Sequence, residues 1–371
     1  MDTIVKKLYN GDMKIKNIKL NNFRNYTDES VDFCDGFNLI SGANGQGKTN
    51  LAEAICFASI AKSPRTHHDE ELVRENQNEA VVSIEIEKDF GKQTLSYYLG
   101  ENKQFFVNGN KLSKLSELFG TLVTVYFSPN EISIVAGSPE DRREFMDTDI
   151  SELSGNYYNL IQRYNKVLFQ RNKLLKNTYD HKAILDQIDI WDEQLASLAA
   201  PIIRTRKNFV AKLLSPAQKA MDFLSKKSEK LSIEYVGAAG ETTTEIKTNI
   251  LGQLKANLNK DMEVGYTTIG PHRDDIKILL NGKDSKIFAS QGQRRSIVLA
   301  IKLGELELFE KELGDKPIFV LDDVFSELDS GRQKKLYECA KDYQVIMTGT
   351  VFKFKPETEY KQIKVKNGRV K

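Results

Sequence analysis

One stretch of ten residues, SGANGQGKTN at 41–50, constrains this chain more than any other. It fits the pattern G-x-x-x-x-G-K-[ST] without a gap, through Gly42, Gly47, Lys48 and Thr49. In that pattern backbone N–H groups wrap a triphosphate, and a Cβ would obstruct their approach. A short apolar run at 36–42 precedes the stretch, and apolar residues at helical spacing over 50–62 follow it. The sequence therefore predicts a nucleoside triphosphate site between a buried strand and a helix.

The chemistry expected of this loop follows from its residue types. The helix that starts at the loop turns its dipole and free N–H groups toward the anion. Lys48 is expected to reach the β- and γ-phosphates, and the Thr49 hydroxyl to ligate Mg²⁺. The nucleotide-binding residues predicted here are Gly42, Ala43, Asn44, Gly45, Gln46, Gly47, Lys48, Thr49 and Asn50.

A second signal is the buried strand KPIFVLDDVFSELD (316–329), which runs into acidic residues. Asp322 is placed to hold Mg²⁺ through its water shell, and Asp323 to polarise an attacking water. Asp323 and Lys48 are therefore the predicted catalytic residues, and Asp322 and Thr49 the predicted metal-binding ones. The alternative is a strand that ends in solvated acids.

A third signal is ASQGQRRSIVLAIKLGELELF (289–309), a helix with Ser290 as a plausible N-cap. The free N–H groups beside Gly292 form a second candidate anion site. The alternative is an ordinary capped helix.

Composition bounds the class of protein. The chain has 371 residues with 40% hydrophobic and 29% charged side chains, which is typical of a soluble globular protein with two domains or lobes. It shows no apolar run of spanning length and no signal peptide, so a cytoplasmic protein is expected. Three scattered cysteines and four histidines argue against a disulfide framework and a zinc site. The net charge of +2 restricts any nucleic-acid surface to a local patch.

The chain divides by pattern into strand-rich and helical parts. Pro201 and Pro216 are expected to punctuate the helical segments between Asp141 and Lys230. Strands are predicted at 13–20, 36–42, 80–88, 93–100, 104–112, 121–128, 316–329 and 343–350. The predicted domains are an N-terminal extension (1–12), the first part of an ATPase lobe (13–120), a mainly helical second lobe leading to SQGQ (121–290) and the second part of the ATPase lobe (291–371).

The order of these motifs resembles that of the ATP-binding-cassette ATPases. SQGQ stands where that superfamily has its signature motif, and SELD (326–329) where it has its D-loop. More narrowly, the chain resembles the RecF family of bacterial DNA recombination and repair proteins, relatives of the SMC ATPases. The matching pieces are KIKNIKLNNFRNY (14–26), GANGQGKTNLAEAI (42–55), VYFSPNEISIVAGSPEDRREFMD (125–147), TIGPHRDDI (268–276), SQGQRRS (290–296) and FVLDDVFSELD (319–329).

The resemblance implies an α/β ATPase lobe of the cassette type, built from both chain ends, with an inserted mainly helical lobe. It implies ATP and Mg²⁺ as cofactors and an ATP-dependent homodimer. In that dimer residues 42–49 of one copy face Ser290, Gly292 and Gln293 of the other. It further implies binding to double-stranded DNA near single-stranded gaps, in recombinational repair and replication restart. There the protein would act with RecR and RecO to promote RecA loading.

Several positions depart from the superfamily pattern or stay open. Asp323 stands where cassette ATPases usually have glutamate, which predicts slow hydrolysis. The switch histidine is missing, and Thr348 or Thr350 is offered in its place. Asn130 is the candidate for the Mg²⁺-coordinating glutamine. Arg24 is expected to contact ATP phosphates, the alternative being an exposed arginine at a strand end. For Arg273, in a Gly-Pro turn, a structural and a catalytic role both stay open.

DNA contacts are expected from basic residues in two places. These are Lys62 and Arg65 after the P-loop helix, and Arg163, Lys166, Arg171 and Lys173 in the helical lobe. The alternative for either cluster is a solvated helix face. Two rival classes of protein remain, the nucleotide-binding subunit of a membrane transporter and a P-loop kinase of a small molecule. The helical insert does not suit the first, and SQGQ and SELD stay unexplained in the second.

Overall fold

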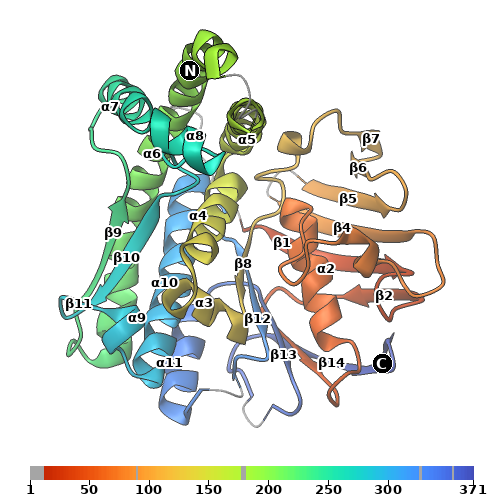
Figure 1. Ribbon diagram of the computed structural model, residues 1–371. Coiled ribbons are helices and arrows are strands. Elements are labelled where there is room, and N and C mark those ends of the chain that lie inside the picture. The colour runs from red at the N-terminus through yellow and green to blue at the C-terminus, as the bar shows by residue number, and fades with distance from the viewer. Residues whose placement is uncertain (1–11, 89–90, 177–180, 326–327, 353–354) are drawn as a thin grey trace.

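The structure is a computed structural model that describes residues 12–88, 91–176, 181–325, 328–352 and 355–371. Two lobes lie side by side, a sheet-rich lobe that carries both ends of the described chain and a lobe dominated by helices (Figure 1). This arrangement confirms the predicted α/β class and the inserted helical lobe. None of the helices in the described ranges is long and apolar enough to cross a bilayer.

A six-stranded sheet forms the centre of the ATPase lobe, in the order β15-β14-β3-β13-β12-β8. Strands β14, β3, β13, β12 and β8 pair in parallel. Of these, β3, β13 and β12 are buried at almost every position, as expected of strands covered on both faces. The strands are β3 (Phe37–Ser41), β8 (Thr124–Phe127), β12 (Ile318–Asp322), β13 (Val345–Gly349), β14 (Tyr360–Lys366) and β15 (Arg369–Val370). The strands predicted around the P-loop and the acidic motif are confirmed.

A second, antiparallel sheet has the order β2-β1-β4-β5-β6-β7. Its members are β1 (Lys14–Asn21), β2 (Asp28–Asp32), β4 (Ala80–Lys88), β5 (Gly91–Leu99), β6 (Gln104–Val107) and β7 (Asn110–Lys111). Along β4 buried residues alternate with half-buried ones, because one face of the sheet packs on the core. Within the segment 104–112, predicted as one strand, a turn at Asn108 and Gly109 with φ of 52° and 77° joins β6 to β7.

Helix α2 (Lys48–Ile60) packs against both sheets, since it contacts β12 and β13 of one and β4 of the other. Most of its residues are buried. The helix therefore carries the P-loop at its N-terminus and connects the two sheets of the lobe.

The helical lobe is built around the 45-residue helix α6 (His181–Ser225), which packs against α5, α7 and α10. Around it lie short helices η3 (Pro129–Ile132), α3 (Ser133–Ala136), α8 (Leu258–Val264) and α9 (Ser285–Phe288), and longer helices α4 (Pro139–Leu153), α5 (Gly155–Leu175), α7 (Thr243–Ala256), α10 (Gln291–Leu313) and α11 (Ser330–Ala340). A small sheet, β11-β10-β9, covers its side with β9 (Leu231–Val236), β10 (Asp275–Leu280) and β11 (Lys283–Asp284).

The long helix α6 differs from the sequence-based expectation at two prolines. Pro201 and Pro216 lie inside α6, whereas the pattern predicts that they separate shorter segments. A proline inside a helix costs about 3 kcal/mol, and the burial of α6 against three other helices overrides that cost.

The lobe boundary differs as well. The sequence pattern places the segment from residue 121 in the helical lobe, whereas β8 pairs with β12 in the ATPase sheet. At the other boundary, the pattern places α10 in the ATPase lobe, whereas this helix packs chiefly on α6. Two further predictions fall partly outside the described residues. They are the extension 1–12, of which only Asp12 is described, and the D-loop SELD, of which residues 326 and 327 are not described.

Candidate nucleotide site and basic surfaces

The P-loop, residues 42–49, joins β3 to α2 and needs glycine for steric reasons at two positions. A Cβ on Gly42 would lie 2.3 Å from the carbonyl oxygen of Val365. At Gly47 φ is 116°, and a Cβ there would lie 2.7 Å from the Asn25 side chain. Neither position therefore accepts another residue without moving the backbone.

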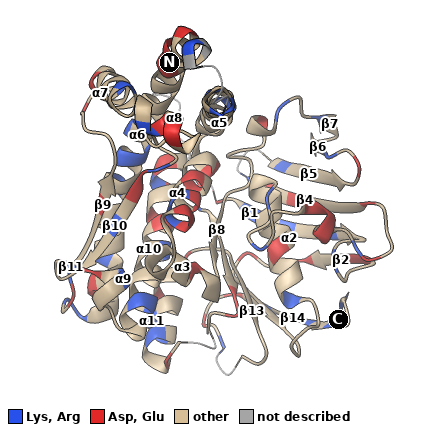
Figure 2. Cartoon of the chain, in the orientation of Figure 1, with Lys and Arg blue, Asp and Glu red and all other residues tan. Residues whose placement is uncertain are grey.

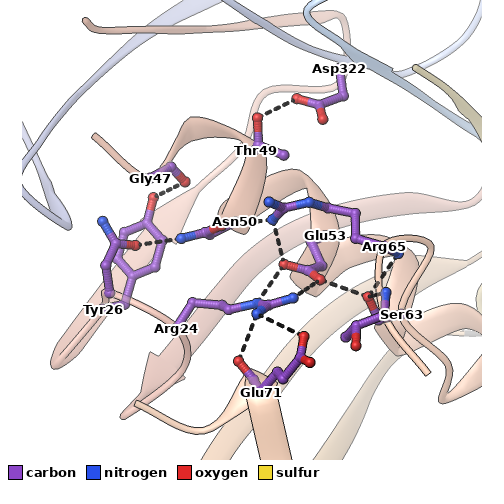
Figure 3. Close-up of polar contacts among 12 residues, drawn as sticks. Arg24, Tyr26, Gly47, Thr49, Asn50, Glu53, Ser63, Arg65, Glu71 and Asp322 are labelled. Atoms are coloured by element: carbon purple, nitrogen blue, oxygen red, sulfur yellow. Dashed lines mark hydrogen bonds and ion pairs between the residues drawn. The ribbon is translucent and has the colours of Figure 1, made fainter. Parts of the chain in front are cut away.

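The loop is held from outside by two neighbouring segments. Tyr26 donates its hydroxyl to the Gly47 carbonyl at 2.9 Å (Figure 3). The Asn25 amide donates to the Gln46 carbonyl at 2.9 Å. Gly368 also donates its N–H to the Gln46 carbonyl, at 3.0 Å. With its carbonyls fixed by these donors, the loop keeps its shape before any phosphate binds. Within the loop, Lys48 is buried and donates to the Ala43 carbonyl at 3.0 Å.

Asp322, at the carboxyl end of β12, meets the first turn of α2. The Thr49 hydroxyl donates to its Oδ1 at 3.0 Å, and the Thr348 hydroxyl at the end of β13 donates to the same oxygen at 2.7 Å. Tyr126 of β8 donates to Oδ2 at 3.1 Å. Because parallel strands end at one edge of the sheet, residues far apart in the sequence converge on this carboxylate.

The donor set fits Mg²⁺. Thr49 and Asp322 offer hard oxygen ligands next to the expected phosphate position, and Mg²⁺ prefers one or two such ligands with waters and phosphate oxygens completing its shell. In the described ranges there is no group of three or more His, Cys, Asp or Glu that would form an all-protein metal cage.

Asp323 follows β12 with φ of 58°, an uncommon backbone conformation for a residue other than glycine. Its N–H donates to the Thr348 hydroxyl at 3.0 Å. Thr348 is fully buried, and its hydroxyl bonds to both aspartates of the motif. Thr350, by contrast, is exposed. Of the two threonines offered in place of the switch histidine, only Thr348 makes these contacts with the aspartates. Asn130 is exposed on η3.

The helix start at Ser290 has the expected cap. Ser290 and Gln293 form a reciprocal capping box at the N-terminus of α10, and the Gln293 amide also donates to Glu229 at 2.8 Å. A Cβ on Gly292 would meet only the Arg332 guanidinium, at an ordinary 3.8 Å. The packing of its own chain therefore does not explain a glycine at this position, although glycine is among the least favourable helix residues.

Arg24 lies in the loop between β1 and β2 and is bound to the P-loop helix. It forms a two-pronged ion pair with Glu53, at 2.6 and 2.9 Å, and donates to the Glu71 carbonyl at 2.7 Å (Figure 3). It is mostly buried, unlike the exposed arginine of the alternative interpretation. Its expected contact with ATP phosphates stays a prediction.

The basic residues proposed for DNA occupy different environments. Lys62 pairs with Glu144 of α4, and Arg65 bonds to Glu53 and Asn50 at 2.9 Å each. Figure 2 shows basic residues along α5 and acidic ones on the neighbouring α4. On α5 the side chains of Arg163, Lys166 and Lys173 are exposed.

Arg171 contradicts the prediction of a DNA contact. Its side chain is fully buried and bonds to Asp192 at 2.6 Å and to Asp261 at 2.7 Å. It holds α5 to α6 and α8, so it is a core residue of the helical lobe. Arg171 shares a sequence run with its exposed neighbours, but the helical period turns it to a different face.

In the GPHRDD stretch (270–275), most side-chain contacts are with other residues of the helical lobe. His272 donates from Nε2 to the Thr267 carbonyl at 3.0 Å, and Nδ1 of the neutral ring accepts from the Tyr164 hydroxyl at 2.6 Å. Burial lowers the pKa of His272 to about 4. Asp275 forms a two-pronged ion pair with Arg142 of α4 at 2.7 and 2.8 Å. Arg273 is exposed and lies over the Tyr266 ring at 4.9 Å.

Some residues of the site are not predicted by the sequence. Tyr26, Asn25 and Tyr126 carry no recognisable motif of their own, and only the fold brings them to the P-loop and Asp322. Glu53 has a signal: it is the one acidic residue in the otherwise apolar helix NLAEAICFASI, and a buried acid needs partners.

The P-loop, the acidic strand end and the capped helix at Ser290, on this two-lobed α/β fold, define an ATPase head of the ATP-binding-cassette type. The family model described as RecF/RecN/SMC N terminal domain matches residues 14–358. Within that class the chain belongs to the RecF family of DNA replication and repair proteins.

Similarity to known members covers nearly the whole chain. The "DNA replication and repair protein RecF" of Ruminiclostridium cellulolyticum is 40% identical over 345 residues, which cover 91% of this chain and 93% of that protein. A solved structure described as the recombination mediator protein RecF-ATP in the RecFOR pathway superposes with a TM-score of 0.90 at 38% identity, covering 97% of both chains. The Smc head domain of Pyrococcus furiosus shares the fold alone, with a TM-score of 0.54 at 15% identity, covering 97% of this chain and 95% of that one.

Proposed function

We propose that this protein is an ATP-dependent DNA-binding ATPase of recombinational repair and replication restart. Membership of the RecF family supports the process, and the site geometry supports the chemistry. ATP is the expected nucleotide, because the similar solved structure is described as RecF-ATP.

The nucleotide would be held mainly by Lys48 and the N–H groups of the P-loop. When ATP binds, Lys48 gives up its hydrogen bond to the Ala43 carbonyl and donates to phosphate oxygens instead. Mg²⁺, when bound at Thr49 and Asp322, would neutralise phosphate charge. Asp323 accepts the proton of an attacking water, and Thr348 fixes both aspartates relative to each other. Aspartate is shorter than glutamate, so it reaches water less well, and hydrolysis is slow.

The observation that carries the proposed homodimer is Gly292. Apart from the backbone of α10 itself, the atom nearest to a Cβ there is the Arg332 guanidinium nitrogen, at an ordinary 3.8 Å, so a glycine at this position leaves room for an approach from outside. Figure 1 shows α9, which leads to Ser290, and α2, which carries the P-loop, in different lobes. A second copy would bring Ser290, Gly292 and Gln293 to the γ-phosphate. ATP binding then stabilises the dimer, and hydrolysis releases it.

DNA is the proposed macromolecular partner, in double-stranded and gapped form. Lys62, Arg65, Arg163, Lys166 and Lys173 supply candidate phosphate contacts, which give affinity without sequence preference. RecR is the proposed protein partner, with RecO and RecA in the same pathway, since the similar solved structure is placed in the RecFOR pathway. The protein would act in the cytoplasm.

The test is the light-scattering mass of Asp323→Asn with Mg²⁺, with and without ATP. This variant retains ATP, so a dimer that forms only with ATP is expected. Ser290→Arg should abolish the dimer. Thr242→Arg is the matched control, because Thr242 forms the same kind of capping box on α7. A mass that stays monomeric while ATP is bound, or equal effects of the two arginine variants, would contradict the shared site.

A further inference from the structure

An exposed aromatic side chain lies in the middle of the basic face of α5. Phe169 has 65% of its surface exposed. Single exposed apolar residues are common, so the neighbours of Phe169 decide what it can do. Lys166 and Lys173 lie three and four residues away from it, at the spacings that place side chains next to one another on a helix. Both lysines are exposed, so the ring has a positive charge on either side of it.

The basic face continues along the helix as one stripe, which we call the α5 stripe. Its exposed members follow one another at steps of three or four residues, and they are Gln162, Lys166, Phe169, Lys173 and Lys176. Helix α5 itself contains no acidic residue, and Figure 2 shows basic residues along it. A positive stripe of this kind complements a phosphate backbone, which favours a nucleic acid over a protein as its partner.

The α5 stripe leads into a cleft of about 750 Å³ between the two lobes. Helix α5 lies on the side of the helical lobe next to the sheet-rich lobe, where it contacts η2 (Leu115–Glu117) (Figure 1). Gln162 and Asn165 of α5 line the cleft, and Lys62 lines it from the loop after α2. The two groups of basic residues proposed for DNA therefore border a single cleft. Acidic residues of α4 line it as well, so its charge is mixed, and the phosphate contacts belong to the stripe.

The spacing along the α5 stripe fits a strand of nucleic acid. At a rise of 1.5 Å per residue, Lys166 and Lys173 are about 10 Å apart along the helix axis, with Phe169 between them. One strand of a duplex carries a phosphate about every 3.4 Å along its axis, so this length corresponds to about three nucleotides. The two lysines can therefore contact phosphates on both sides of a nucleotide whose base meets the ring.

A phenylalanine ring has no hydrogen-bonding group, so it can bind the face of a base but cannot read its edge. In an intact duplex the neighbouring bases cover those faces by stacking. A face is accessible where a strand is single, as at a gap. An aromatic ring beside phosphate-binding basic residues is the arrangement with which proteins hold single strands.

We propose that the α5 stripe holds a DNA strand by its phosphates and that Phe169 stacks on an unpaired base where that strand is single. Lys166 and Lys173 contact the phosphates of paired and unpaired DNA alike, whereas Phe169 contributes only at a gap. The inference rests on the proposed function, and it deepens that function by naming the residue that distinguishes a gap from an intact duplex.

The test compares the affinity of the Asp323→Asn protein, with ATP and Mg²⁺, for a gapped duplex and for an intact duplex of equal length. We expect tighter binding of the gapped duplex by about 5- to 140-fold, the usual effect of one stacked base. In Phe169→Ala this preference should fall to within about twofold of one, while the affinity for the intact duplex stays unchanged. Phe169→Tyr keeps the ring and should retain the preference. Lys166→Ala combined with Lys173→Ala should weaken the binding of both DNAs.

Ile190→Ala is the matched control. Ile190 of α6 is also a large apolar side chain, 60% exposed, but its neighbours at the same spacings are the acidic Asp186 and Glu193. This variant should bind both DNAs as the parent protein does.

Four outcomes would overturn the inference. They are equal affinities of the parent protein for the two DNAs, a gap preference that Phe169→Ala retains, an equal loss in Ile190→Ala, and a loss in Phe169→Ala that is equal for gapped and intact DNA. The second outcome would leave Phe169 to a protein partner, and the last would place it against paired DNA. The proposed function fails separately if the parent protein with ATP binds neither DNA.

Discussion

Thr49 and Asp322 are 273 positions apart in the sequence, and the hydroxyl of one donates to the carboxylate of the other at 3.0 Å. The contact joins the helix that carries the P-loop to the strand that carries the acidic pair. Thr348 bonds to the same Asp322 oxygen and, through its hydroxyl, to the N–H of Asp323. The three strand and helix ends therefore form one hydrogen-bonded unit, whose arrangement follows from the parallel order β3-β13-β12.

Thr348→Val should slow ATP hydrolysis while ATP still binds. Valine keeps the shape but leaves the Asp323 N–H without its acceptor, and it leaves Asp322 Oδ1 with Thr49 in place of two donors. We expect a fall in kcat of about 10- to 100-fold, the usual effect of removing a residue that orients a metal ligand. Single-turnover hydrolysis and ATP affinity are measured side by side. Thr350→Val is the comparison, since Thr350 is exposed just beyond the end of the same strand. A larger effect at Thr350 would contradict the assignment.

Gly292→Ala should stabilise the fold and weaken the dimer. Alanine is preferred over glycine in helices by up to about 1 kcal/mol. The added Cβ meets nothing closer than 3.8 Å in its own chain. In a dimer that Cβ would lie where the γ-phosphate approaches. Urea unfolding and ATP-dependent light scattering test the two effects. Gly252→Ala on α7, where a Cβ would meet nothing within 4 Å, should stabilise without changing the dimer. Retention of the ATP-dependent dimer in Gly292→Ala would contradict the prediction.

Much of the site is readable from the sequence because its signals are local. The P-loop, the acidic end of β12 and the cap at Ser290 each need a fixed order of residue types within a few positions. Residues that act through tertiary contacts are not readable in this way. Thr348 is one of two threonines near a strand end, and only the pairing of β12 with β13 separates them.

The fold shows the same division. The strands around the P-loop have apolar runs that predict them, whereas α6 continues through Pro201 and Pro216 because of packing that no local pattern records. Arg171 resembles its exposed neighbours in type, and its burial depends on Asp192 and Asp261, which come from other helices. A charged residue type alone does not distinguish a buried ion pair from a solvated face.

Arg163→Ala combined with Lys166→Ala should weaken DNA binding without affecting stability. Both side chains are exposed on α5. For each phosphate that the protein no longer neutralises, the slope of log affinity against log salt should become less negative by about 1. The control is Lys212→Ala with Lys219→Ala, which removes the same charge from exposed positions on α6. Equal salt slopes in the two double variants would rule out a DNA contact on α5.

Arg171→Met should act on folding alone. The substitution leaves two buried carboxylates, Asp192 and Asp261, without their common partner. Removing one member of a buried ion pair costs about 3–5 kcal/mol, so a drop of that size is expected in the free energy of unfolding in urea. DNA affinity per folded molecule should stay unchanged. A change in the salt slope without a loss of stability would restore Arg171 as a DNA contact.

Glu152→Gln should change how stability depends on pH. Glu152 of α4 is buried between Ser59 of α2 and Thr124 of β8, and burial raises its pKa to about 8. A raised pKa means that the folded state binds more protons than the unfolded one. The stabilisation is therefore fully present below the ordinary value of 4.5 and is lost as pH rises through about 8. Glutamine keeps the hydrogen bonds and removes the titration.

The variant should flatten the curve of unfolding free energy between pH 7 and 8, by about 1 kcal/mol per pH unit. His272 does not affect the slope in this window. Burial lowers its pKa to about 4 from an ordinary 6.5, so its contribution to stability rises with pH only up to about the ordinary value and is constant above it. Burial also raises the pKa of Asp149, to about 7. Asp149 therefore lowers stability with rising pH in the unchanged protein and in Glu152→Gln alike. Glu140→Gln, exposed on the same helix, is the control. If urea unfolding gives parallel curves for the protein and Glu152→Gln across this window, Glu152 is ionised in the folded state and the junction of α2, β8 and α4 holds a charge.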